Sequence, residues 1–365
     1  MSGSLVDWRL AAGVARRVGG AGDADVRARP FGLEPEALGA TCAEAERLIR
    51  AYSLLDPESR LPVPEAVGRA EWSRGALSTL RGLADELQRE HAVEINLPGP
   101  LGGIARSVVG AATGTEVGIA AGYAARRVLG QYDVTIAGPE RPARLLFVAP
   151  NLTASAAQLE VDFDAFLRWV ALHETTHAIQ FAEAPWLRGH LGGLIRSLIA
   201  GATQGLGLSD LLRRLASNPR GTLSTLLRGD LAQAIAGPEQ APTLDRIQAA
   251  MTVIEGHAEH VMDAAAADFV PDVEVLRDRL STRRASRGPL ETIAARLLGL
   301  DLKLRQYELG KSFCDAVVAD SGIATLNRVW SGPDAIPSTD ELACPEAWLE
   351  RIATSESVPW AATTP

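Results

Sequence analysis

The sequence predicts a mainly α-helical protein with a small β element ahead of a helix that carries two histidines. Residues 5–20, 35–54 and 72–91 repeat apolar side chains at the spacing of amphipathic helices, with glycine or proline between them. By contrast, Leu145–Ala149 is apolar throughout and lies between prolines, which is typical of a short buried strand. A succession of helices with one clear strand therefore defines the expected fold class.

Length and charge limit the classes of protein that fit. With 365 residues, the chain can form one large domain over 1–350, or two packed lobes at 1–150 and 151–350, before a flexible tail at 351–365. The net charge of −9 argues against a general nucleic-acid binder. The three cysteines contain no CxxC pair, which favours a reducing compartment and gives no thiolate zinc site. They are Cys42, Cys314 and Cys344.

The most membrane-like stretch is 101–129, where glycines recur every four residues from Gly110 to Gly122. Charged residues such as Arg106 and Glu116 interrupt it, so no run of about 18 apolar residues exists. Small residues at this spacing let a helix approach a neighbour closely, and we expect a packed core helix. The chain also begins without an apolar targeting segment. We therefore expect a cytoplasmic protein with no membrane insertion.

Residues 173–177 read His-Glu-Thr-Thr-His and carry the strongest functional signal. In a helix, His173 and His177 lie one turn apart on the same face, so two imidazole nitrogens can bind one metal ion. Glu174 then lies where it can reach a water on that metal. The pattern predicts a zinc site with an open position for chemistry. A core helix with two hydrogen-bonded histidines is the competing interpretation.

The flanking residues place these histidines on the buried face of a helix. Asp162 or Asp164 can cap the start of this helix, and Pro185 indicates that it has ended. Apolar side chains and the histidines recur at spacings of three and four, which predicts a buried stripe. The stripe comprises Phe163, Phe166, Val170, His173 and His177.

Glu255 is the best candidate for a third ligand. It lies within the apolar stripe of a second predicted helix, and a carboxylate there is costly unless it is paired or binds a metal. Glu259, one turn later, faces the same way and can accept the other ring N–H of a ligand histidine. Alternatively, both glutamates are exposed beside that face. The stripe comprises Ile247, Met251, Ile254, Ala258 and Met262.

Other side chains compete for the third position. Metzincin proteases place a glycine three residues and a histidine six residues after the second histidine, but Gln180 and Glu183 stand there in this chain. Glu183 could approach the metal only if the helix ended early. His190 lies on a loop beyond the helix and is a weaker candidate. His257 and His260 point elsewhere if Glu255 points inward, and we expect them to be hydrogen-bonded or solvated.

Three further segments suggest roles in substrate binding or catalysis. The strand at 145–149 precedes the histidine helix and could offer an edge on which an extended peptide pairs. Tyr307 or Arg305 could stabilise the oxyanion of a carbonyl under attack. A packed tyrosine with a hydrogen-bonded hydroxyl is the alternative. Five arginines between 277 and 287 are expected to form a solvated edge, with anion binding as the alternative.

Four blocks of the sequence together resemble one protein family. They are His173–Phe181, Glu255–Asp263, Leu304–Gly310 and Asn327–Trp330. The blocks are similar to those of actinobacterial zincin-like (HExxH) zinc-dependent metalloproteases, also known as coenzyme F420 biosynthesis-associated proteins, over about residues 5–350. This resemblance implies a largely helical zincin-like fold. Glu255 and Glu259 also resemble the ligand and supporting acid of gluzincins, although aspartate is commoner at the second position.

We therefore expect a zinc-dependent metallopeptidase that acts on a peptide or protein. Zn²⁺ bound by His173, His177 and Glu255 would activate a water molecule, and Glu174 would take its proton and return it to the leaving amine. Tyr307 would assist at the oxyanion. The alternatives are a non-catalytic zinc-binding helical protein and an accessory factor for coenzyme F420 biosynthesis.

Overall fold

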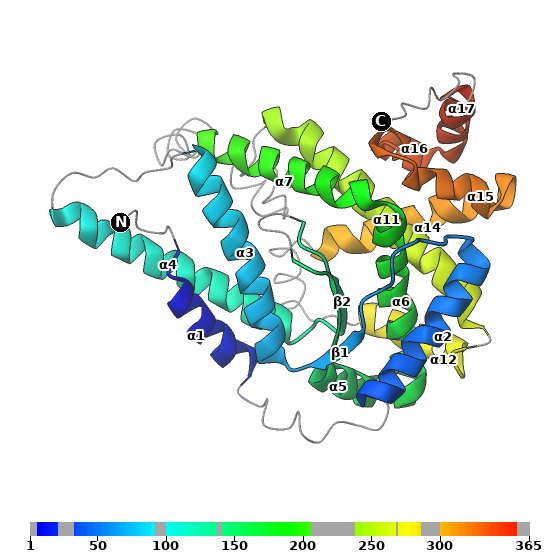
Figure 1. Cartoon of the computed structure of the whole chain (residues 1–365), viewed down its shortest axis with the longest axis horizontal. Coiled ribbons are helices and arrows are strands. Elements are labelled where there is room, and N and C mark those ends of the chain that lie inside the picture. The colour runs from blue at the N-terminus through cyan, green and yellow to red at the C-terminus, as the bar shows by residue number, and fades with distance from the viewer. Residues whose placement is uncertain are drawn as a thin grey trace. The chain divides into compact units, whose positions relative to one another are not determined.

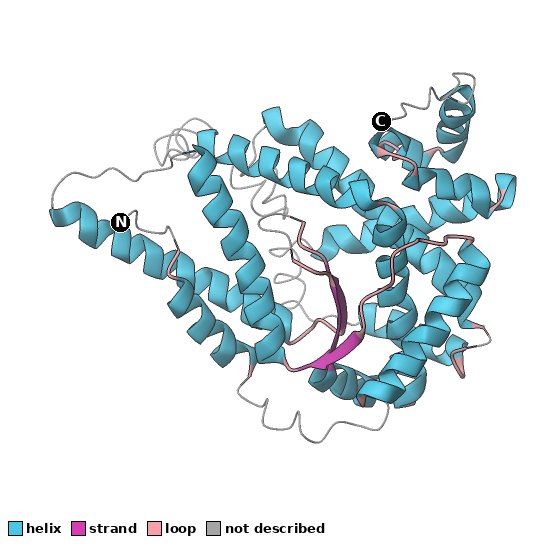
Figure 2. Cartoon of the chain, in the orientation of Figure 1, coloured by secondary structure: helices cyan, strands magenta, loops and turns pink. Residues whose placement is uncertain are grey.

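The computed structural model describes residues 6–20, 33–91, 100–136, 141–205, 238–267, 269–285 and 300–355. Helices account for most of these residues, and the three strands among them form one small sheet (Figure 2). The prediction of a mainly α fold with a small β element is therefore confirmed.

The helices (α), 3-10 helices (η) and strands (β) follow one another along the chain as Figure 1 labels them. They are α1 (Trp8–Gly19), α2 (Pro35–Ser53), β1 (Pro64–Val67), α3 (Arg69–His91), α4 (Pro100–Ala125), β2 (Gly130–Asp133), β3 (Arg144–Val148), α5 (Ala149–Leu159), α6 (Phe163–Glu183), α7 (Pro185–Gly205), η2 (Pro238–Gln240), α11 (Ala241–Ala266), α12 (Val273–Ala285), α14 (Leu300–Ser321), α15 (Ile323–Leu326), η3 (Asn327–Trp330), η4 (Pro333–Ala335), α16 (Thr339–Ala343) and α17 (Pro345–Ser355).

The chain forms two compact units, and each consists of segments that are far apart in the sequence. The first comprises Met1–Glu46, Leu61–Ala178 and Ala266–Ser286. The second comprises Arg47–Arg60, Ile179–Ala265 and Arg287–Pro365. The predicted tail and the predicted lobe boundary at residue 150 remain predictions.

Helices α1, α3 and α4 pack together in the first unit (Figure 1). Along α4, three glycines face the backbone of α1, and we call this contact the α1/α4 seam. A Cβ at Gly114, Gly118 or Gly122 would lie 2.5, 2.6 or 2.7 Å from a carbonyl oxygen of α1 or its N-cap. Because a real Cβ does not approach that closely, the two helices can meet here only through glycine.

The predicted packed helix at 101–129 is therefore confirmed as α4. Over the part of the chain that the structure describes, no helix is both long and apolar enough to cross a membrane. The carbonyl oxygen of Gly110 also accepts a hydrogen bond from the Asp7 backbone amide at 2.9 Å, which extends the contact between α4 and the chain entering α1.

The sheet has the strand order β1-β3-β2, with β1 parallel and β2 antiparallel to β3. Phe147 and Val148 are fully buried, which explains why this strand is apolar on both faces. The prediction that this strand offers a peptide-pairing edge was wrong, because β3 is the central strand and both its edges are paired. The strand also ends at Val148, and Ala149 already begins α5.

Helix α6 carries the HExxH sequence and forms as predicted. The Asp162 carboxylate accepts a hydrogen bond from the Ala165 amide at 2.9 Å, so it caps the first turn. Phe166 and Val170 are buried on the predicted stripe. The helix ends at Glu183, and α7 begins at Pro185, where a proline fits the first turn of a new helix.

In the second unit, α11 and α14 cross at two glycines. A Cβ added at Gly256 would lie 2.1 Å from the carbonyl carbon of Gly310. A Cβ at Gly310 would lie 2.1 Å from the carbonyl oxygen of Thr252. We call this contact the α11/α14 crossing. Further along α14, the buried ring of Phe313 packs edge-on against Trp348 at 5.4 Å, which joins α14 to α17.

Polar side chains also join α11 and α14. His260 Nδ1 lies 2.6 Å from an Asp315 carboxylate oxygen, and the other oxygen of Asp315 accepts from Lys311 at 2.6 Å. Lys311 also lies 3.1 Å from Asp263, so its ammonium connects both helices. On the other ring nitrogen of His260, the Tyr52 hydroxyl lies at 2.7 Å. This network fixes the rotation of α11 about its own axis relative to α14.

Candidate metal centre

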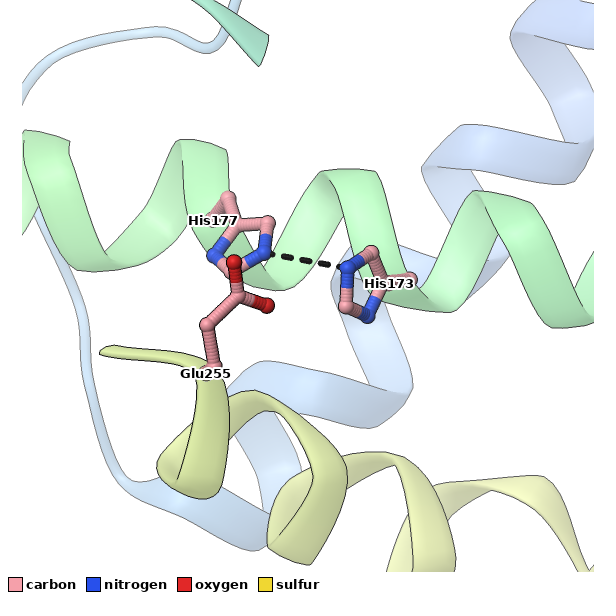
Figure 3. Close-up of side chains that lie close together, drawn as sticks. All are labelled: His173, His177 and Glu255. Atoms are coloured by element: carbon pink, nitrogen blue, oxygen red, sulfur yellow. Dashed lines mark hydrogen bonds between the residues drawn. The ribbon is translucent and has the colours of Figure 1, made fainter. Parts of the chain in front are cut away.

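Two histidine side chains project from adjacent turns of α6 (Figure 3). Their Nε2 atoms lie 3.1 Å apart, and the two rings meet edge to face with centroids separated by 4.5 Å. His177 is 9 % exposed, whereas His173 is half-buried. The i, i+4 spacing therefore brings two imidazole nitrogens together, as the sequence predicted.

Glu255 on α11 supplies a carboxylate to the same group. One ligand atom from each of His173, His177 and Glu255 lies within 4.8 Å of the others. Figure 3 shows the carboxylate turned toward the ring of His177. Glu255 is only 7 % exposed, so the prediction of a glutamate within a buried stripe is confirmed.

The donor set matches the requirements of zinc. In a tetrahedral site with Zn–N bonds of about 2.0–2.1 Å, two nitrogens are separated by about 3.3 Å. The observed 3.1 Å between the histidine nitrogens is close to that distance. Two imidazoles and one carboxylate also leave a fourth position open, which is the pattern of catalytic rather than structural zinc sites. These residues therefore fit a zinc ion.

A buried glutamine fixes the helices that carry these donors. Gln180 lies one turn after His177 on α6, and its amide nitrogen donates to the carbonyl oxygen of Ile254 at 2.9 Å. The same nitrogen lies 3.0 Å from Nδ1 of His257. Because Ile254 directly precedes Glu255, this contact holds α11 beside α6 close to the candidate third ligand. This role of Gln180 was not predicted from the sequence.

The carboxylate of Glu174 rests on strand β2 in the first unit. Its Oε2 accepts a hydrogen bond from the backbone amide of Tyr132 at 3.0 Å. A Cβ at Gly130 would lie 2.5 Å from Glu174 Cγ, so the strand approaches the side chain closely. Glu174 is 7 % exposed, and it keeps this buried position through a backbone donor. Sequence reasoning missed Gly130 and Tyr132 entirely.

The competing histidines have other partners. His257 is fully buried, bonded to Gln180 and packed edge-on against Trp330 at 5.1 Å. His260 belongs to the polar network of α11 and α14 described above. Both histidines are therefore hydrogen-bonded, which was one of the two states expected for them.

His190 and Glu183 lie outside the group of candidate ligands found among the described residues. His190 lines a pocket of about 460 Å³ in the second unit, together with Arg246, Glu341 and Arg351. Burial lowers the pKa of His190, and the nearby charge of Arg246 lowers it further.

The predicted helper residues lie on α11 and α14. Glu259 is half-buried on α11, one turn beyond Glu255. The side chains of Tyr307 and Arg305 lie outside the described residues, although both positions belong to α14. Of the arginines between 277 and 287, Arg277 pairs with Glu274, and Arg279 pairs with Glu160. Those two pairs agree with a solvated edge.

The three cysteines, which were not expected to bind zinc, are free thiols. Cys42 lies beside Thr175 on the histidine helix, and burial raises the pKa of its thiol to about 12. The negative charge of Glu174 raises the pKa of Cys42 further, while the adjacent Thr175 side chain opposes the shift. The thiol is therefore protonated at neutral pH.

Fold and donor set together define a class: a mainly helical protein whose HExxH helix presents a candidate His–His–Glu metal centre. The model of the zincin-like metallopeptidase family matches residues 6–349, so the chain belongs to that family. The resemblance that the sequence blocks suggested is thus confirmed at the level of the family. The association with coenzyme F420 biosynthesis and the actinobacterial origin remain predictions.

One solved structure supports the same grouping. It is the crystal structure of a candidate hydrolase with a novel fold from Chloroflexus aurantiacus. The two proteins share 30% sequence identity and superpose with a TM-score of 0.66. The match covers 95% of this chain and 99% of that one. No curated protein matches the sequence. Family and structural neighbour together indicate a hydrolase of the zinc-dependent kind.

Proposed function

We propose that this protein is a zinc-dependent metallopeptidase in which His173, His177 and Glu255 bind the metal and Glu174 is the general base. The observation that carries this proposal is the convergence of three ligand atoms within 4.8 Å of one another, next to a buried glutamate. Membership of the zincin-like metallopeptidase family supports the reaction class.

The proposed chemistry divides between the metal and the protein. When bound, zinc supplies Lewis acidity that polarises a carbonyl group and makes water a better nucleophile at neutral pH. Glu174 accepts a proton from the attacking water as the new C–O bond forms. The same carboxylic acid then donates that proton to the amine nitrogen as the C–N bond breaks. The hydrogen bond from the Tyr132 amide holds Glu174 in place during both transfers.

Two supporting roles belong to the same proposal. Glu259 would accept the second ring N–H of a ligand histidine and so fix its tautomer, as carboxylates beside zinc sites commonly do. Tyr307 would donate a hydrogen bond to the developing oxyanion. Replacement of Glu259 by Gln should weaken zinc binding about 10-fold to 100-fold. Replacement of Tyr307 by Phe should lower kcat while leaving zinc bound.

The first test is the metal content of the purified protein, measured by mass spectrometry. Wild type should contain about one zinc per chain, and Glu255→Ala should lose it. Glu183→Ala is the matched control, because this glutamate ends the histidine helix but lies outside the donor group. Zinc retained by Glu255→Ala and lost from Glu183→Ala would overturn the proposed ligand set.

The second test separates a peptidase from a non-catalytic zinc protein. Wild type and Glu174→Gln should bind zinc equally, but only wild type should cleave members of a quenched fluorescent peptide library. The expected loss in Glu174→Gln is at least about 100-fold, because a general base typically contributes that much or more. A folded wild type that binds zinc and cleaves no peptide would contradict the proposed activity.

A further inference from the structure

We propose that Gly130 is a positioning residue for Glu174: the missing side chain at Gly130 creates the space that the carboxylate arm occupies. The inference rests on the proposed role of Glu174 as general base. It adds a structural determinant outside both the HExxH helix and the metal ligands. Gly130, Tyr132 and Glu174 all belong to the first unit.

The close approach involves the side chain of Glu174, not the backbone of its helix. A Cβ at Gly130 would lie 2.5 Å from Cγ, 2.9 Å from Cδ and 2.9 Å from Oε1 of Glu174. These three atoms belong to a flexible side chain that can rotate away, whereas helix α6 is held by its buried stripe. Alanine at Gly130 should therefore displace the carboxylate while the fold remains.

The pairing of β2 explains why this strand meets Glu174. The Val148 amide donates to the Leu129 carbonyl oxygen, so alternate residues from Leu129 onward direct their backbone groups toward β3. Gly130 and Tyr132, at the intervening positions, direct theirs to the opposite side. The Tyr132 amide donates to Glu174 from that side. Thus a backbone donor and an adjacent missing side chain together determine where the carboxylate lies.

A displaced general base should slow proton transfer without weakening substrate binding. Misplacement of a catalytic group by about 1 Å can reduce the rate about 100-fold. The carboxylate would also lose its bond to the Tyr132 amide, because rotation about the side chain moves Oε2 together with Oε1. The slower reaction and the lost hydrogen bond can be measured separately. The rate measurement needs zinc and a substrate, whereas hydrogen exchange at the Tyr132 amide needs neither.

The experiment compares Gly130→Ala with Gly75→Ala, a helical control at which an added Cβ meets no atom within 4 Å. For Gly130→Ala, kcat on the best wild-type peptide substrate should fall about 10-fold to 100-fold, with KM and zinc content unchanged. In the zinc-free protein, hydrogen exchange at the Tyr132 amide should become at least about tenfold faster. Gly75→Ala should change neither. Wild-type kcat and unchanged exchange in Gly130→Ala would overturn the inference.

A double-mutant cycle covers the case in which Gly130→Ala unfolds. The Glu174→Ala change removes the three atoms that lie nearest to a Cβ at Gly130. The melting temperature of Gly130→Ala/Glu174→Ala should then equal that of Glu174→Ala alone. An equal loss of stability in both backgrounds would show that Gly130 supports the strand instead, and would overturn the inference. If wild type proves to have no peptidase activity, the proposed function fails, but the exchange and the cycle still test the positioning.

Discussion

Two pairs of helices in this molecule meet through glycine, but they do so differently. The α1/α4 seam repeats the contact at Gly114, Gly118 and Gly122, one turn apart. The α11/α14 crossing concentrates it at Gly256 and Gly310, where the two backbones face each other directly. A repeated contact aligns two helices along their length, whereas a single contact fixes a point about which they cross.

The difference matters because the crossing lies next to a candidate metal ligand, whereas the seam does not. Gly256 directly follows Glu255, the candidate third ligand, so the position of α11 at the crossing sets the position of that carboxylate. The seam lies on helices that carry none of the proposed ligands. We infer that the seam contributes to stability alone, whereas the crossing contributes to both stability and metal binding.

The largest effect is expected for Gly256→Ala. An added Cβ would lie 2.1–2.5 Å from three backbone atoms of Gly310 on α14, so α11 must move. We expect a loss of about 3 kcal/mol in the free energy of unfolding, as for other overpacked cores. Zinc affinity should also fall at least about tenfold, as when a ligand loses its supporting contacts. Urea unfolding of the zinc-free protein and competitive zinc titration measure the two effects.

Gly189→Ala on α7 is the matched control, because an added Cβ there meets no atom within 4 Å. It should leave zinc binding unchanged and stabilise the helix by about 0.5–1 kcal/mol. If Gly256→Ala lost stability but bound zinc like wild type, the crossing would not position Glu255.

A smaller and simpler effect is expected for Gly118→Ala in the seam. The added Cβ would lie 2.6 Å from the Ala11 carbonyl oxygen and 2.8 Å from Val14 Cβ. We expect a loss of about 2 kcal/mol in unfolding free energy. Zinc stoichiometry and affinity should remain those of wild type. Weakened zinc binding in this variant would erase the distinction between the two helix pairs.

The smallest effect concerns the polar network beside the crossing. Burial opposes ionisation of Asp315, but hydrogen bonds from His260 and Lys311 outweigh it, so the pKa of Asp315 lies below its ordinary value of 3.8. A lowered folded-state pKa gives stability that is present above the unfolded pKa and is lost as pH falls through the folded pKa. The side chain is 45% exposed, so the gain is at most about 1 kcal/mol.

Asp315→Asn should therefore unfold more easily than wild type at pH 7. The difference in unfolding free energy should shrink as pH falls below about 4, where the aspartate becomes protonated first in the unfolded chain and then, at lower pH, in the folded protein. Urea unfolding at pH 7, 5 and 3 measures this trend. A difference that stayed constant over these three values would mean that Asp315 stabilises the crossing without its charge.

The features of the site that could be predicted from the sequence are those that depend on the periodicity of a single helix. The spacing of His173 and His177, and the burial of Glu255 within an apolar stripe, follow from helical geometry over a few residues. The glycines of α4 were also informative, because their spacing of four marks a helix face that approaches a neighbour. Each of these features is determined within one helix, so the sequence around it is sufficient.

The features that were missed depend on contacts between distant segments. Gly130 and the Tyr132 amide reach Glu174 from a strand more than forty residues away, and a backbone donor leaves no side-chain signal in the sequence. Gln180 was noted only as a mismatch to the metzincin pattern, although it is fully buried and joins α6 to α11. The role assigned to β3 was wrong because an apolar run indicates a buried strand but does not give its order in the sheet.

The parallel pairing of β1 with β3 has a consequence for the order of folding. The chain between these strands contains α3, α4 and β2, so a long segment must be arranged before the sheet can close. Non-local strand pairing of this kind is slow, whereas helices form from local contacts within microseconds. The helix bearing the histidines can therefore form before β1 completes the sheet. A newly made chain would form its HExxH helix early and close the three-stranded sheet last.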